Sequence, residues 1–223
     1  MERRLNFAGC SGIGKTTLAK ALSEQWNVPF VSGSYSDLVP STKDMSHNSM
    51  IMEDAQTIYA QDTKLMALRR KLFRNTPEFI CDRSFLDSAA YMIQKLSHRL
   101  PQCDIEDFVE KCRILTVSLC PKTVFLPFTE EYFYHWEIEQ NGKRISNKFY
   151  QTEVSLLMGW LLSHWGCELH NVITIGNDQA PVWSMEAFLP GGEKEYTQIL
   201  VLETQDHEKR MRLINEFLQW QLF

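Results

Sequence analysis

A glycine-rich loop at residues 9–16, with the sequence GCSGIGKT, constrains the fold of this chain more than any other feature. It satisfies the pattern G-x-x-x-x-G-K-[ST], in which glycines allow backbone N–H groups to turn toward phosphate oxygens. The pattern requires a buried strand before the loop and a helix after it. An apolar run at residues 5–8 and helical spacing over residues 15–26 meet that requirement. The start of the chain is therefore predicted to be a strand, a phosphate-binding loop and a helix.

The residue types in this loop suit particular parts of a nucleoside triphosphate. Lys15 is expected to reach the β- and γ-phosphates, and the Thr16 hydroxyl is expected to ligate Mg²⁺. The residues of this loop predicted to bind ATP are Gly9, Ser11, Gly12, Ile13, Gly14, Lys15, Thr16 and Thr17. ATP and Mg²⁺ are thus the predicted cofactors. The six histidines show no spacing typical of a further metal site.

Strand-like and helix-like segments alternate after the loop. Strands are predicted from apolar runs at residues 28–31, 79–81 and 122–128. Helices are predicted at residues 51–74, 85–96, 148–165 and 206–221. Asp104 is the expected N-cap of a further helix that ends near residue 119. This alternation is typical of an α/β three-layer sandwich, in which a mostly parallel central sheet has helices on both faces.

The later part of the chain is less regular. Residues 172–176 and 198–203 are both candidates for the last parallel strand, and the sequence leaves the choice between them open. Two prolines and a Gly-Gly pair predict a loop or an atypical insertion at about 177–197. The length of 223 residues fits a single domain over residues 1–223 that carries a small lid.

Composition and charge restrict the classes of protein. The net charge of −5 counts against binding to duplex nucleic acid, because such proteins usually present a basic face. The six cysteines form no CxxC pair, which favours reduced thiols rather than disulfides. The sequence suggests neither a signal peptide nor a membrane span, because its longest apolar segment, residues 154–165, is too short. The cytoplasm, including that of an infected host cell, is the expected compartment.

Asp82, Arg83 and Ser84 directly follow the predicted strand at residues 79–81. In open α/β sheets, ligands bind at the carboxyl ends of the strands, so these side chains are expected near the phosphates. Asp82 is a candidate to hold Mg²⁺, directly or through water, or to accept a proton from an acceptor hydroxyl. Arg83 is a candidate to clamp phosphate or acceptor oxygens. The alternative is a surface Asp-Arg pair with no such role.

The string FICDRSFLDSAAY at residues 79–91 resembles the D-R-S-x-x-D-x-x-A-Y pattern of P-loop kinases. These are the nicotinamide-riboside-kinase-like and phage thymidylate-kinase-like ATPases, relatives of the deoxynucleoside kinases. The resemblance covers residues 3–95 well, is weaker over 120–170 and is poor over 177–200. It implies that Asp82 is the carboxylate at the reaction centre and that Arg83 faces the phosphates. Asp87 would cap or brace the following helix, or contribute to function.

The resemblance also implies a lid over the phosphates at residues 129–148. Lids of such kinases exclude water and bring cations over the transferred group. The candidate cations are Lys143, Arg144 and Lys148, and Arg144 is favoured as a catalytic residue for its fork geometry. The alternative is a solvated hairpin loop, since Asn141-Gly142 is ordinary turn chemistry.

Further site candidates follow from the same resemblance. In similar kinases, the helix predicted at residues 51–74 lines the acceptor pocket, and the loop before the last helix wraps the adenine ring. The acceptor candidates are Gln56, Tyr59, Gln61 and Arg69, with Tyr35 and Asp37 from the preceding loop. Arg210 is the candidate to stack on adenine; the alternative is a capped, solvated helix start.

Three functions are compatible with these features. The first is ATP- and Mg²⁺-dependent phosphoryl transfer to a nucleoside or a nucleoside monophosphate. The second is a kinase that acts on nucleic acid, at a strand end or at the hydroxyl of a modified base such as a hydroxymethylated pyrimidine. The third is a P-loop ATPase that is not a kinase. A homodimer is compatible with all three.

Overall fold

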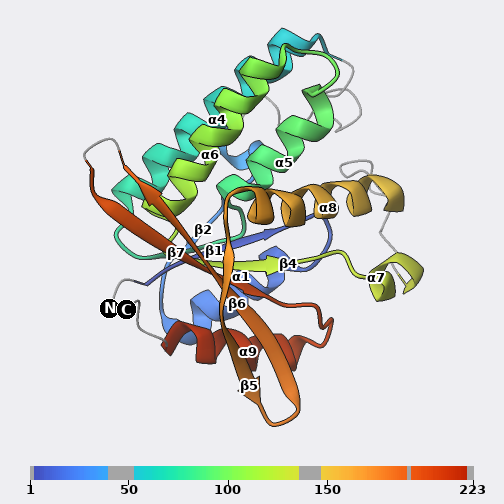
Figure 1. The fold of residues 1–223 in the computed structure, drawn as a ribbon. Coiled ribbons are helices and arrows are strands. Elements are labelled where there is room, and N and C mark those ends of the chain that lie inside the picture. The colour runs from blue at the N-terminus through green and yellow to red at the C-terminus, as the bar shows by residue number, and fades with distance from the viewer. Residues whose placement is uncertain (1–2, 40–52, 136–146, 190–191, 220–223) are drawn as a thin grey trace.

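The computed structural model describes residues 3–39, 53–135, 147–189 and 192–219. Seven strands form one sheet in the order β2-β3-β1-β4-β7-β6-β5 (Figure 1). The strands are β1 (Arg4–Gly9), β2 (Phe30–Val31), β3 (Phe79–Cys81), β4 (Lys122–Leu126), β5 (Glu168–Ile175), β6 (Asp178–Phe188) and β7 (Lys194–Val201). Strands β2, β3, β1, β4 and β7 run parallel, and β6 and β5 extend the sheet antiparallel. The predicted α/β fold with a mostly parallel sheet is confirmed.

Helices cover both faces of this sheet (Figure 1). The helices are α1 (Lys15–Trp26), α2 (Tyr35–Leu38), α4 (Ala55–Asn75), α5 (Phe85–Leu96), α6 (Gln102–Leu119), α7 (Glu130–His135), α8 (Lys148–His164) and α9 (His207–Gln219). Helices α1 and α9 lie on one face, and α4, α5, α6 and α8 lie on the other (Figure 1). The central strands are buried on both faces, as expected for parallel strands; all of β4 is buried. Among the described residues, no helix combines the length and the apolar character that a membrane crossing needs.

Side chains cap the starts of α4 and α5. Asp54 accepts a hydrogen bond from the backbone N–H of Thr57 and begins α4. Ser84 and Asp87 form a reciprocal capping box that begins α5. The prediction that Asp104 caps α6 is wrong: the helix begins earlier, after Pro101, because the Asp104 N–H already donates to the Pro101 carbonyl.

The antiparallel strands at the edge of the sheet differ from what the sequence predicts for the later part of the chain. The loop predicted at 177–197 is wrong, because most of it forms β6, whose Ala180, Val182, Met185 and Ala187 are buried. Pro181 lies opposite Val172 of β5 but just beyond the part of β6 that pairs with β7, which begins at Val182, so it takes no place in the β6–β7 ladder. Of the two candidates for the last parallel strand, residues 198–203 fall largely within β7, while residues 172–176 belong to β5 of the hairpin.

Candidate phosphate-binding site

The glycine-rich loop joins the end of β1 to the start of α1, as its pattern predicts. Gly9 has a φ of 145°, and a Cβ atom there would lie 2.6 Å from the Leu126 carbonyl oxygen. Gly14 is the N-cap of α1 in a left-handed conformation, with a φ of 95°. Side chains at either position would strain the backbone, so glycine is required for this loop geometry. The loop therefore lies at the N-terminus of a helix, where backbone N–H groups favour anions.

Lys15 lies at the centre of the site and is only 4% exposed. Its Nζ atom donates hydrogen bonds to the carbonyl oxygens of Gly9 and Cys10, both at 2.6 Å. Burial, with a smaller contribution from Arg83, lowers the pKa of Lys15 from 10.5 to about 8. The amine is thus held by the loop itself, close to where phosphates would bind.

Asp82 reaches the loop because β3 pairs directly with β1, with Asn6 opposite Cys81. The Thr16 hydroxyl donates a 2.6 Å hydrogen bond to Asp82 Oδ2. Asp82 Oδ1 accepts a 3.2 Å hydrogen bond from the backbone N–H of Gly33. Mg²⁺ prefers hard oxygen ligands, one or two carboxylates in addition to phosphate oxygens. A hydroxyl and a carboxylate in contact at the mouth of this loop fit that donor set.

Arg83 follows Asp82 and is held in place from two sides. Its carbonyl oxygen accepts a 3.0 Å hydrogen bond from the Asn6 side chain of β1. Its guanidinium Nη1 lies 3.9 Å from Asp87 Oδ1, and its side chain is 25% exposed. Arg83 is therefore fixed at its backbone, and its partly exposed side chain brings the guanidinium beside Asp87.

Arg210 reaches the phosphate loop from α9, far along the chain, and is buried. It donates hydrogen bonds to the carbonyl oxygens of Ile13 (3.2 Å) and Thr204 (2.6 Å) and to the Tyr132 hydroxyl (2.6 Å). Its guanidinium also lies 5.6 Å from the centre of the Tyr132 ring. The helix start before it is capped and exposed, as the alternative had it, since Asp206 Oδ1 accepts a 3.0 Å hydrogen bond from the Lys209 N–H, but Arg210 itself is not solvated. Its role toward adenine stays a prediction.

Helix α8 supplies two buried polar side chains that the sequence prediction missed. Gln151 Oε1 accepts a 3.0 Å hydrogen bond from the backbone N–H of Ser11. Ser155 Oγ accepts a 2.8 Å hydrogen bond from the backbone N–H of Phe128, after β4. The two residues are one turn apart on the buried face of α8, among apolar neighbours such as Val154 and Met158. Polar residues on an otherwise apolar helix face are the signal that could have identified them.

The predicted acceptor residues fall into two groups. The Tyr35 hydroxyl donates a 2.7 Å hydrogen bond to Gln61 Oε1, and Gln61 Nε2 donates to Glu53 at 2.7 Å. By contrast, Arg69 is buried and donates to the Ser84 and Gly33 carbonyl oxygens and to the Ser88 hydroxyl. Arg69 therefore ties α4 to the start of α5, while its buried Nε has no hydrogen-bond partner among the described residues.

The other acceptor candidates lie nearer the surface. Gln56 is exposed, and Tyr59 is half-buried with its ring 6.2 Å from that of Phe108. Asp37 accepts hydrogen bonds from the hydroxyls of Ser32 and Ser34. The structure thus brings only Tyr35 and Gln61 together directly.

Some site candidates lie apart from these contacts. Lys143 and Arg144, the favoured lid cations, lie outside the described residues. Lys148 is the first residue of α8, and Thr17 is exposed on the first turn of α1. Within the described part of the chain, no group of three or more His, Cys, Asp or Glu could hold a metal ion on its own.

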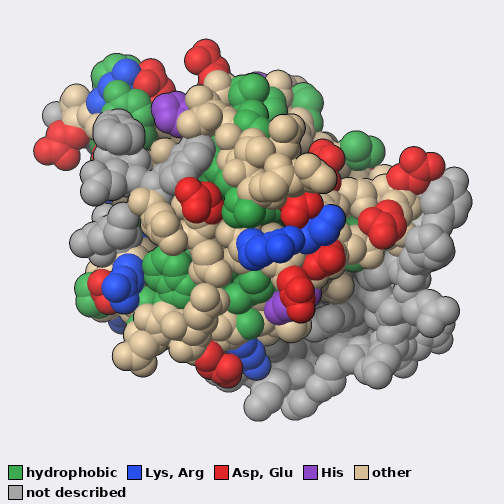
Figure 2. Space-filling model, turned by 90° about the horizontal axis from the view of Figure 1, so that it is seen from below, with side chains coloured by type: hydrophobic (Ala, Val, Ile, Leu, Met, Phe, Trp, Pro, Cys, Tyr) green, Lys and Arg blue, Asp and Glu red, His purple; other side chains and the backbone are tan. Residues whose placement is uncertain are grey.

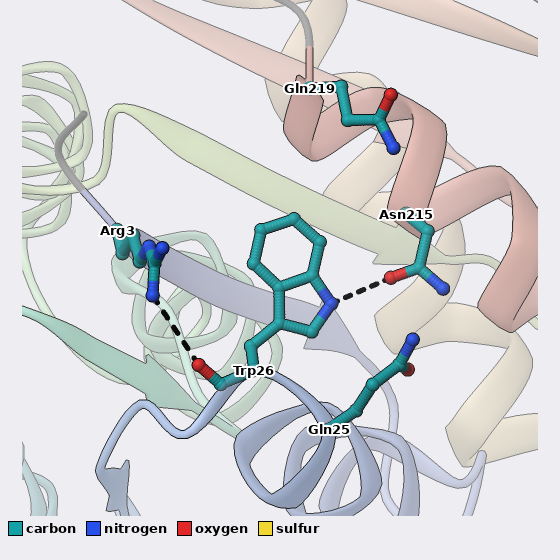
Figure 3. A pocket seen from close by; sticks show the side chains of 5 residues that line it. All are labelled: Arg3, Gln25, Trp26, Asn215 and Gln219. Atoms are coloured by element: carbon teal, nitrogen blue, oxygen red, sulfur yellow. Dashed lines mark hydrogen bonds between the residues drawn. The ribbon is translucent and has the colours of Figure 1, made fainter.

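A second hollow lies at the opposite end of α1 (Figure 3). It is lined by Arg3, Gln25, Trp26, Asn215 and Gln219. Trp26 Nε1 donates a 2.7 Å hydrogen bond to Asn215, and Arg3 donates to the Trp26 carbonyl oxygen at 3.4 Å. Trp26 therefore joins the end of α1 to α9 and to the residue before β1.

The face that includes α9 carries charges of both signs (Figure 2). Asp178 pairs there with Lys209 and Arg212, each at 3.1 Å. On the coloured part of this face, acidic and basic side chains alternate (Figure 2). The described part of this face therefore does not present a single-sign basic surface, the usual electrostatic footprint for nucleic acid (Figure 2).

Comparisons with known proteins agree with the fold. Residues 4–174 match the sequence model of a family described as an AAA domain. A sequence comparison with curated proteins finds no match. Among solved structures, deoxyadenosine kinase from M. mycoides with bound dCTP is similar, with a TM-score of 0.61 and 11% identity. The match covers 96% of this chain and 97% of that one.

NadR protein in complex with NAD and AMP-PNP is also similar, with a TM-score of 0.58 and 12% identity. That match covers 100% of this chain but 51% of NadR, so the chain spans about half of its length. Identities this low show the fold alone. The fold expected from the resemblance to P-loop nucleoside kinases is confirmed.

Proposed function

The chain belongs to the AAA domain family, and from this premise we propose that it is an ATP-dependent kinase acting on a nucleoside or a nucleoside monophosphate. The observation that carries the proposal is the contact between Thr16 of the phosphate loop and Asp82 of the neighbouring strand end, at 2.6 Å. A phosphate loop alone supports only binding of a triphosphate. A carboxylate and Arg83 beside it provide groups that phosphoryl transfer requires.

Transfer of the γ-phosphoryl group depends on positioning and on neutralising charge. Lys15 and the loop N–H groups would hold the β- and γ-phosphates. Thr16 and Asp82 would hold Mg²⁺, which when bound supplies charge neutralisation at the phosphate oxygens. Arg83 would contact the transferred group, since its side chain is partly exposed and its guanidinium, like the Lys15 amine, lies 3.9 Å from Asp87 Oδ1.

Asp82 has two possible roles in this scheme, and one carboxylate can perform both. One oxygen would serve the metal beside Thr16, while the other would orient or deprotonate the acceptor hydroxyl. Arg144 is proposed as a further cation that closes over the phosphates with the segment at residues 129–148. Arg210 is proposed to lie against the adenine ring, supported by its contacts with the loop carbonyl of Ile13 and with Tyr132.

The proposed acceptor class rests on two considerations. One similar structure is described as a deoxyadenosine kinase with bound dCTP, and another as NadR protein in complex with NR. The ligands in these two descriptions are a nucleotide and a nucleoside. In this chain, the hydrogen bond from the Tyr35 hydroxyl to Gln61 Oε1 brings a phenol and an amide together, which supports their proposed role toward the acceptor. Amides suit the hydrogen-bonding edge of a base, and an aromatic ring suits stacking.

A screen with ATP labelled at the γ-phosphate tests this proposal. The acceptors would be nucleosides, nucleoside monophosphates, nicotinamide riboside and oligonucleotides, each with and without Mg²⁺. We expect label in one nucleoside or nucleotide product only. Transfer to the oligonucleotides alone would favour a nucleic-acid kinase, and hydrolysis that no acceptor stimulates would favour an ATPase that is not a kinase.

The Asp82→Asn variant sharpens the test. The amide keeps the size of the side chain and its contact with Thr16, but it loses the charge. ATP binding without Mg²⁺ is expected to persist while transfer is lost. Transfer by this variant at the rate of the unmodified protein would contradict the proposed role of Asp82.

A further inference from the structure

The two oxygen atoms of Asp87 have different surroundings. Oδ2 accepts hydrogen bonds from the backbone N–H of Ser84 at 2.9 Å and from its hydroxyl at 2.5 Å, which completes the cap of α5. Oδ1 is buried and accepts no hydrogen bond within the described residues. The residue as a whole is 2% exposed. A cap requires only one oxygen, so the burial of the second needs another explanation.

Oδ1 of Asp87 lies between the two cations of the phosphate site. It is 3.9 Å from Lys15 Nζ and 3.9 Å from Arg83 Nη1. Both distances exceed hydrogen-bonding range, so the oxygen acts on the cations as a charge and does not occupy their donors. The Lys15 amine instead donates to the Gly9 and Cys10 carbonyl oxygens.

The site needs such a charge when no phosphate is bound. Lys15 and Arg83 are close enough that the positive charge of Arg83 disfavours the charged form of Lys15, and neither side chain is fully solvated. The other nearby carboxylate, Asp82, is already bound to Thr16 and to the N–H of Gly33. Asp87 is thus the carboxylate in the described structure that lies within 4 Å of both cations.

We propose that Asp87 is the resident counter-ion of the phosphate site, which balances Lys15 and Arg83 in the empty protein and limits how tightly the site holds phosphate. This role rests on the proposed function, and it adds a control on nucleotide release. Phosphate oxygens take over the donors of both cations when a nucleotide binds. Asp87 stays close to them, and its charge opposes that of the phosphates and favours their departure.

The Asp87→Asn variant separates this role from the cap. The Asn oxygen can accept the hydrogen bonds of Ser84, so the cap is retained while the charge is lost. We expect the dissociation constants of ATP, ADP and inorganic tripolyphosphate to fall roughly five- to tenfold, as expected for one unit charge removed a few ångströms away. Adenosine, which has no phosphate, should bind as it does to the unmodified protein.

Two control variants distinguish charge from structure. Ser84→Ala removes the cap hydroxyl and keeps the Asp87 charge, so it should lower the Tm without tightening ATP binding. Asp62→Asn removes a different buried carboxylate, which pairs with Lys95 at 2.9 Å, and should likewise not tighten ATP binding. A merely structural role for Asp87 predicts that Asp87→Asn, like Ser84→Ala, does not tighten ATP binding, which makes the direction of the change decisive.

Several results would overturn the proposal. Equal or weaker ATP affinity in Asp87→Asn would contradict it, as would equal tightening in Ser84→Ala. If Asp87→Asn is unfolded without ligand, tripolyphosphate should restore folding, because it replaces the missing negative charge. If tripolyphosphate does not restore folding, the counter-ion role of Asp87 is also contradicted. Failure of the proposed function would be distinct from these outcomes, because the unmodified protein would then transfer no label to any acceptor, whereas the counter-ion role is tested by ATP affinity alone.

Discussion

The Thr16 hydroxyl donates a 2.6 Å hydrogen bond to Oδ2 of Asp82, which joins the start of α1 to the end of β3. The two residues are 66 positions apart in the sequence. Parallel pairing of β3 with β1 brings them together, because it aligns the carboxyl ends of both strands. The contact is the feature from which the metal-binding and transfer roles are proposed.

Thr16→Val should remove the Mg²⁺-dependent part of ATP binding. Valine has nearly the shape of threonine but no hydroxyl, so the loop should fold while one oxygen ligand is lost. ATP affinity without Mg²⁺ should stay close to that of the unmodified protein. Titration calorimetry with and without Mg²⁺ measures the difference. Thr16→Ser, which restores the hydroxyl, should recover the Mg²⁺ effect, and a full Mg²⁺ effect in Thr16→Val would rule out Thr16 as a ligand.

Lys15→Ala should lower phosphoryl transfer by roughly 10²–10³-fold or more, the range found when one preorganised electrostatic contact to a reacting group is removed. The lost amine is the buried cation nearest the loop carbonyl oxygens of Gly9 and Cys10. Transfer of label from ATP gives the rate. Lys71→Ala, which changes an exposed lysine on α4, serves as the control. Full activity in Lys15→Ala would contradict the whole kinase proposal.

The elements around the phosphate loop could be predicted because their signals are local. The predicted segments 79–81 and 85–96 coincide with β3 and α5, where a buried apolar run is followed by a capping box. The hairpin of β5 and β6 could not be predicted, because the prolines suggested a loop. Pro181 lies next to the end of the β6–β7 pairing. This position depends on the order of strands in the sheet, which a local sequence pattern does not predict.

Arg210→Ala should lower the free energy of unfolding by about 2–4 kcal/mol, because it removes charged hydrogen bonds and leaves buried carbonyl oxygens without donors. Those carbonyls belong to Ile13 and Thr204. Urea denaturation measures the loss. Tyr132→Phe removes only the 2.6 Å bond between the Tyr132 hydroxyl and Arg210, so it should cost less. Equal stability of Arg210→Ala and the unmodified protein would show that these contacts do not hold the loop.

The thiol of Cys10 should resist alkylation at neutral pH, although it lies in the phosphate loop. Burial raises its pKa from 9.0 to about 11, so at pH 8 only about a thousandth of it is thiolate. Because its pKa is raised, the Cys10 thiol stays protonated at neutral pH. Its reactivity should grow only as the pH approaches about 11 or when the protein unfolds. Iodoacetamide labelling followed by peptide mass spectrometry gives the rates. Exposed Cys103 is the internal control, and equal labelling of both at pH 8 would contradict the prediction.

Contacts between distant segments account for what the sequence prediction missed at the site. Gln151 and Ser11 are 140 positions apart, and Arg210 and Ile13 are 197 apart. Helical spacing shows that Gln151 lies on the buried face of α8, but it does not show which element that face covers. The sheet order places α8 beside the loop after β1, and only this arrangement gives the Ser11 N–H its acceptor.

Gln151→Leu tests whether α8 holds the phosphate loop in its binding geometry. Leucine keeps the volume and the buried position but leaves the Ser11 N–H without the 3.0 Å bond to Gln151. An unsatisfied buried donor costs about 1–3 kcal/mol, so urea denaturation should show a loss of that size. ATP binding should weaken as well, because the freed loop must be ordered again when phosphate binds. Thr152→Ala is the matched control, since its hydroxyl donates within α8, to the Lys148 carbonyl oxygen at 2.9 Å. If both variants lose stability equally and neither weakens ATP binding, α8 contributes packing alone, and the coupling between this helix and the loop is refuted.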